Sequence, residues 1–141
     1  MNESTGLKDY MNSITLFFND LDEPLNIGKS EIKTLLHILS GVSDFRMKGK
    51  TIYGLENLLA ICFYLAIKGE FHSFHYAATY VRIKECKFVE LGLVEKGKTP
   101  SHDTFRRIFS HLDAAALRDA FICKINTFLE AIAVHDKGMK G

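Results

Sequence analysis

The stretch that decides the fold reads TPSHDTFRRIFSHLD, residues 99–113. Pro100 disfavours a helical conformation at the residue before it, and the Ser101 hydroxyl can accept from the free N–H groups of a first turn. We therefore expect a helix to begin at His102. Four large apolar side chains follow at i, i+3, i+4 and i+7 spacing: Phe105, Ile108, Phe109 and Leu112. This stripe predicts an amphipathic helix whose apolar face is buried.

The outer face of that helix is cationic and polar. Asp103 lies in the first turn, where a negative charge suits the positive end of a helix. Four further side chains point away from the stripe: His102, Arg106, Arg107 and Ser110. Two adjacent guanidinium groups near a helix start are typical of a helix that contacts DNA. They are also typical of an ordinary solvated helix face, and spacing alone leaves both interpretations open.

Apolar periodicity predicts helices on both sides of this stretch, at residues 7–21, 30–41, 53–68, 74–91 and 113–132. The segment 53–68 is apolar on nearly every face, which is typical of a central helix surrounded by others. The expected N-caps of three of these helices are Ser30, Ser73 and Asp113. A break is expected around residues 84–87. No strand pattern of useful length occurs, so the sequence predicts an all-α, compact bundle of about five to seven helices.

The connector 92–99 bears on whether a helix-turn-helix is present. It is longer than the turn of about three or four residues that a standard helix-turn-helix uses. Any helix-turn-helix here is therefore expected to be a variant with an extended linker. We divide the chain into an N-terminal amphipathic helix with its linker (1–29) and a helical domain (30–133).

Composition permits nucleic-acid binding without requiring it. The 141 residues have a formal net charge of +1, but the first 25 carry five acids against one lysine, which leaves +5 on the remainder. The loop 42–51 adds three candidate phosphate contacts: Arg46, Lys48 and Lys50. Flexible basic loops often touch phosphate and are more often simply solvated.

Cysteine usage and the N-terminus indicate a cytoplasmic protein. The three cysteines, Cys62, Cys86 and Cys123, form no C-x-x-C pair, which argues against a disulfide framework and a cysteine zinc site. There is no signal-peptide pattern, and the longest apolar run, 58–67, is too short to span a bilayer.

Motifs for a cofactor, a metal or catalysis are missing from the sequence. His72 and His75 form an H-x-x-H pair without a carboxylate or cysteine at ligand spacing, so we predict no metal site. Phosphate-binding glycine loops, a G-x-S-x-G elbow and H-E-x-x-H are absent as well, and we expect no cofactor.

Several motifs together resemble the amino-terminal domain of bacterial insertion-sequence DDE transposases related to the H-repeat-associated proteins of Rhs elements. They are SDFR (43–46), YGLENLL (53–59), PSHDTFRR (100–107) and the Leu112–Asp113 pair. The resemblance covers roughly residues 32–133, and PSHDTFRR is its most specific part. It implies a helical, transposase-associated region.

In that family a strand follows the helices, opens the RNase-H-like catalytic domain and carries the first metal-binding acid. Asp136 matches that acid by position, but His135 looks inserted, and Lys137–Gly138 reverses the family's usual Gly-Lys order. We accordingly expect residues 134–141 to be the shortened start of that strand. One carboxylate cannot hold the two ions of a two-metal site, so no catalysis by this chain is expected.

The sequence thus predicts the accessory N-terminal domain of a truncated transposase that binds double-stranded DNA at the element ends. In this prediction the arginines and loop lysines contact phosphates, while His102 or Ser110 approaches base edges. Two alternatives stay open. The chain is either a helical interaction module, as a homodimer or on a transposase subunit, or a folded remnant without present function.

Overall fold

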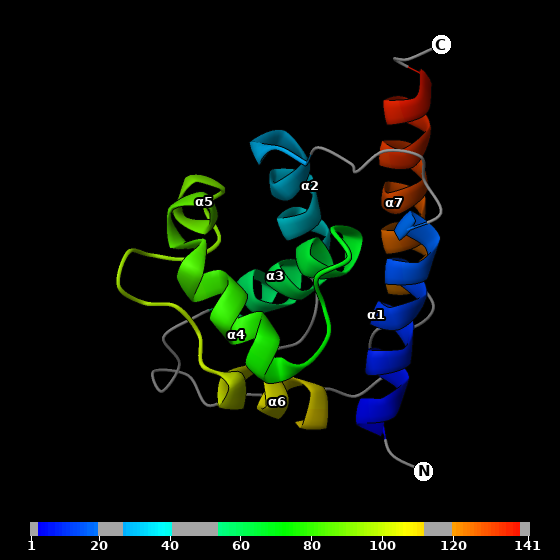
Figure 1. Ribbon diagram of the computed structural model, residues 1–141. Helices are drawn as coiled ribbons and strands as arrows, with labels where there is room; N and C mark the ends of the chain where they lie inside the picture. The colour runs from blue at the N-terminus through cyan, green and yellow to red at the C-terminus, as the bar shows by residue number, and fades with distance from the viewer. Residues whose placement is uncertain (1–2, 20–26, 41–53, 112–119, 139–141) are drawn as a thin grey trace.

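The computed structural model is a bundle of helices and describes residues 3–19, 27–40, 54–111 and 120–138 (Figure 1). The helices are α1 (Glu3–Asn19), α2 (Lys29–Leu39), α3 (Leu55–Ile67), α4 (Phe74–Ile83), α5 (Glu85–Glu90), α6 (His102–His111) and α7 (Ala120–Gly138). Within these ranges the only β feature is one isolated bridge between Glu95 and Lys98. The predicted all-α class is confirmed.

Helix α3 is the centre of the bundle. Apart from Glu56 and Asn57, every residue of α3 is buried, in agreement with its unbroken apolar sequence. Helices α1 and α2 pack against it, and Tyr64 of α3 meets Phe88 of α5 edge to face, with 5.4 Å between ring centroids. Gly69 follows α3 with φ of 75°, a conformation that suits glycine at a helix end. The predicted central helix is thus confirmed.

Helix α1 contributes its inner face to the same core. Met11, Ile14 and Phe18 are buried, and α1 packs against α3 and α6. Tyr10 ties α1 to α7, which lies beside it in Figure 1, because its hydroxyl donates to Asn126 Oδ1 at 2.8 Å. Burial of the phenol raises the pKa of Tyr10 to about 12. The first amphipathic helix therefore docks on its own chain.

Two of the predicted N-caps are confirmed. The Ser73 hydroxyl accepts from the Tyr76 N–H at 3.0 Å, and the Ser101 hydroxyl accepts from the Thr104 N–H at 3.3 Å. The predicted cap at Ser30 is wrong, because α2 begins at Lys29 and the Glu31 carboxylate reaches back to the Gly28 N–H at 2.8 Å. Asp113 lies outside the described residues.

Between α3 and α6 the chain forms two helices, with a break between them where the sequence predicts one. Helix α4 ends at Ile83 and α5 begins at Glu85, which confirms the expected break. The connector from α5 to α6 contains a tight turn at Glu95–Lys98, and Glu85 of α5 holds it by accepting from the Gly97 N–H at 2.5 Å. Helix α6 packs mainly against α4 and α1. Its main neighbours in space thus do not include α5, the helix that precedes it in sequence.

The end of the chain differs from the expectation. Where a strand was expected to begin at Val134, α7 continues as a helix to Gly138. A strand needs a neighbouring strand to satisfy its backbone groups, and the described part of the chain offers none. The residues before it are already helical, so helix propagation satisfies the same groups locally.

The three cysteines differ in their exposure. Cys62 is enclosed within α3, and burial raises the pKa of its thiol well above its usual range, while Cys86 and Cys123 are exposed. Among the described helices, none combines the length and the apolar character that crossing a membrane requires.

Candidate nucleic-acid interface

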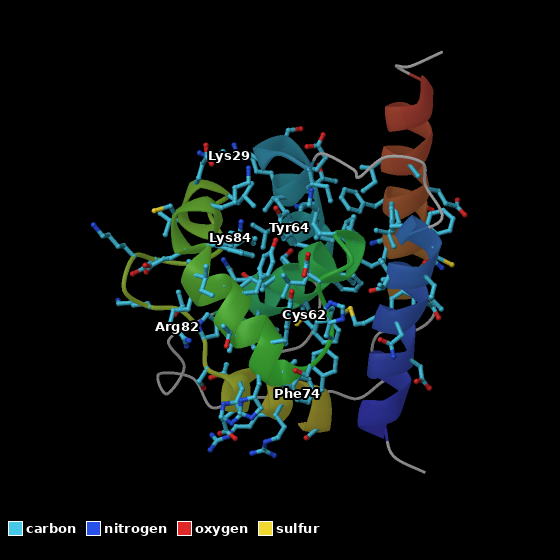
Figure 2. The ribbon with its side chains drawn as sticks, in the orientation of Figure 1. Lys29, Cys62, Tyr64, Phe74, Arg82 and Lys84 are labelled. Carbon is cyan, nitrogen blue, oxygen red and sulfur yellow. The ribbon has the colours of Figure 1, made fainter. Side chains whose placement is uncertain are left out.

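Helix α6 is fixed by its apolar stripe. Phe105, Ile108 and Phe109 are at most 1% exposed, as the sequence predicted, while Leu112 lies outside the described residues. Phe109 stacks on Phe71 with ring centroids 5.5 Å apart and meets Phe74, at the start of α4, at 5.1 Å. These three rings, the aromatic cluster, fasten α6 to the beginning of α4, where Figure 2 labels Phe74.

The opposite face of α6 is exposed. The side chain of Arg106 is 54% exposed and that of Arg107 is 69% exposed. His102 and Ser110 are exposed as well. The structure therefore brings four predicted site residues onto one solvent-facing surface, whereas Arg46, Lys48 and Lys50 lie outside the described residues.

Asp103 is the electrostatic centre of this face. One of its carboxylate oxygens accepts from Arg106, and the other lies 3.0 Å from Nε of Arg107. The hydrogen bond from Arg106, with the nearby charges of Arg106, Arg107 and His102, holds the pKa of the Asp103 carboxyl below its usual range. Asp103 is thus ionised at neutral pH, and Asp103, Arg106 and Arg107 together carry one net positive charge.

A pair of imidazole rings joins α6 to α4 at the surface. His75 of α4 stacks on His102 of α6, with ring centroids 3.8 Å apart and an interplanar angle of 21°. Both residues are exposed. The stack joins the N-terminal ends of α4 and α6, which therefore present one common surface.

The other histidine of the H-x-x-H pair points elsewhere. The His72 ring meets Tyr76 edge to face at 4.6 Å, and its Nε2 lies 3.9 Å from a Glu70 carboxylate oxygen. His72 and His75 therefore do not converge. No group of three histidine, cysteine, aspartate or glutamate side chains suited to a metal ion occurs within the described ranges.

Two features of this surface were missing from the sequence prediction. The ion pairs of Asp103 could have been predicted from the sequence, because Arg106 and Arg107 follow Asp103 at i+3 and i+4, the spacings at which helix side chains meet. The stack of His75 on His102 has no such signal, since 27 positions separate the two residues and only the packing of α4 on α6 unites them.

Comparison with known proteins identifies the family. A family model described as DDE_Tnp_1-associated matches residues 36–123, more than half of the chain, from within α2 to the first turn of α7. No curated protein matches the chain, and no solved structure does. The matching model describes a domain that accompanies the transposase and not its catalytic domain, while the narrower relation to Rhs-linked proteins stays a prediction. The chain therefore belongs to the DDE_Tnp_1-associated family of transposase-associated domains.

Proposed function

We propose that this domain is an accessory part of a DDE transposase and binds double-stranded DNA through the exposed face of α6, without catalysis of its own. The observation that supports it is the pair of adjacent, exposed guanidinium groups of Arg106 and Arg107 on a helix whose other face is buried. Arginine recognises phosphate through paired N–H donors, and phosphate contacts supply most of the affinity of such complexes.

In the proposed complex, Arg106 and Arg107 contact phosphates, and the exposed His102 and Ser110 approach base edges. The basic loop residues Arg46, Lys48 and Lys50 are proposed as further phosphate contacts. The family relation supports this role because a transposase has to engage the DNA of its own element.

In this proposal, Asp103 competes with DNA phosphate for Arg106 and Arg107. In the free protein its carboxylate occupies donors of both arginines, so a phosphate must displace or share that carboxylate. The same negative charge also repels the phosphate. Asp103 is therefore expected to weaken binding while it holds the two guanidinium groups close together.

The test is a titration of a fluorescent duplex that carries an element end, at about 50 to 200 mM salt, with the wild type and Asp103→Asn. We expect wild-type affinity to fall steeply with salt, by a log–log slope of about −0.9 for each phosphate neutralised. The Asp103→Asn substitution keeps a polar side chain of the same size but removes the competing charge, so the variant is expected to bind about fivefold more tightly.

The two arms give separate information. A wild type that binds without salt dependence, or not at all, contradicts the proposed function. If the Asp103→Asn variant binds more weakly than the wild type while its thermal midpoint is unchanged, the expected competition is wrong. Asp103 then favours binding by holding the side chains of Arg106 and Arg107 in place.

A helical interaction module is the second candidate, and one observation favours it. Leu16 and Phe17 of α1 are 67% and 48% exposed, and Phe17 borders a groove of about 200 Å³ between α1 and α7. A homodimer through this face would cover them. Size-exclusion chromatography with light scattering tests it: this candidate requires a dimer that Leu16→Glu dissociates, and a wild type that is monomeric at all concentrations removes it.

A further inference from the structure

The flank of α4 that carries His75 also carries an arginine. Arg82 follows His75 by seven residues, which in an α-helix places it about 20° from the same direction and roughly 10 Å further along the axis. Figure 2 places Arg82 at the edge of α4, on the side of the connector that leads to α6. Both side chains are exposed, whereas Ala77, Ala78 and Val81 of the same helix are buried.

The matching flank of α6 has the same composition. Arg106 follows His102 by four residues, which places it about 40° from the same direction and roughly 6 Å along the axis. Because His75 stacks on His102 at 3.8 Å, the two flanks meet at the imidazole pair. The four residues Arg82, His75, His102 and Arg106, here called the row, therefore lie on two flanks that meet at the stacked rings, with one arginine further along each helix.

The arginine on α4 is electrostatically unlike the one on α6. None of the ion pairs within the described ranges includes Arg82, whereas Arg106 is bound by Asp103. An exposed guanidinium without a carboxylate beside it is fully available to an anion. Among the described residues, Arg82 thus lies outside any ion pair, whereas the charge of Arg106 is partly neutralised by Asp103.

We infer that this row is one DNA-contact surface, which adds Arg82 and His75 of α4 to the α6 interface and follows the phosphate backbone. The inference rests on the proposed function. The helical rises alone separate the two arginines by more than one phosphate repeat, because phosphates of one strand recur about every 3.4 Å along the duplex axis. Arg82 and Arg106 therefore engage different phosphates of the same duplex.

The experiment compares Arg82→Ala, the charge-preserving Arg82→Lys and Lys29→Ala with the wild type in the duplex titration, beside the Arg106→Ala/Arg107→Ala double variant. Lys29 is an exposed lysine on α2, which Figure 2 shows at the end of the molecule away from α6, so its removal changes net charge alone. One lost phosphate contact lowers the salt slope by about 0.9 and the affinity by about threefold to tenfold at about 0.1 M salt. We expect this loss for Arg82→Ala, little change for Arg82→Lys and no change for Lys29→Ala.

The possible outcomes distinguish failure of the row from failure of the proposed DNA binding by α6. If Arg82→Ala binds like the wild type while the double variant is weakened, the row is wrong and the α6 interface stands. If Lys29→Ala loses as much as Arg82→Ala, affinity follows net charge and the row is wrong. If neither the double variant nor Arg82→Ala changes the affinity, both proposals fail. Because Arg82 is exposed, thermal midpoints of its variants are expected to match the wild type.

Discussion

Replacing Phe109 by alanine is expected to lower the free energy of unfolding by about 3–5 kcal/mol. Phe109 is 1% exposed, so the substitution leaves a cavity in the core. It also removes the ring contacts with Phe71 at 5.5 Å and with Phe74 at 5.1 Å, each of which is worth about 0.5–1.5 kcal/mol beyond simple burial. Urea denaturation followed by circular dichroism measures the loss. Domains of this size are stable by only about 5–15 kcal/mol, so the variant is expected to lose a large share of its total stability.

Phe17→Ala is the matched control, because it makes the same chemical change on a side chain that is 48% exposed. We expect it to cost much less than Phe109→Ala, because about half of the Phe17 side chain is already in solvent. Phe109→Leu keeps most of the buried volume and is expected to fall between the two. Equal losses for Phe109→Ala and Phe17→Ala would mean that α6 is not held by its apolar stripe.

Replacing Arg106 and Arg107 together by alanine is expected to weaken DNA binding by about tenfold or more at about 0.1 M salt. Two lost phosphate contacts reduce the log–log salt slope by about 1.8 in magnitude. The effect should be nearly uniform across sequences, because phosphate contacts carry no sequence information directly. Fluorescence anisotropy with an element-end duplex and a scrambled duplex, at several salt concentrations, measures both quantities.

Folding is not expected to confound this measurement. Both arginine side chains are more than half exposed, and solvent screens exposed ion pairs such as theirs with Asp103, so these pairs contribute little to stability. Lys29→Ala/Lys33→Ala removes the same number of charges from exposed positions on α2 and is the control. Affinity that falls equally in both double variants would show that α6 has no special part in binding.

The secondary structure was largely predictable because its causes are local. The unbroken apolar sequence of α3, the stripe of α6 and the caps at Ser73 and Ser101 can each be read from neighbouring residues. The start of α2 differs from the prediction because the carboxylate of Glu31, and not the hydroxyl of Ser30, accepts from the backbone at the helix start. Residues 134–138 are helical and not the strand that the family resemblance implies, because they continue a helix that satisfies their backbone groups locally.

The candidate site was predictable only in part. The exposed face of α6 follows from its stripe, since burying one side of a helix presents the other. The contribution of α4 depends on which helices pack together, and helical periodicity does not encode that. The hydrogen bond from Tyr10 to Asn126, which spans 116 positions, is a contact of the same kind.

The enclosure of α3 has a consequence for how such domains diversify. Almost all side chains of α3 are buried, so this helix has very little exposed surface for contact with another molecule. Each surrounding helix needs only one apolar face to cover α3. Their outward residues, such as those of α4 and α6, are therefore free to vary without disturbing the interior. Related chains that keep this inner helix can acquire different recognition surfaces while retaining the same architecture.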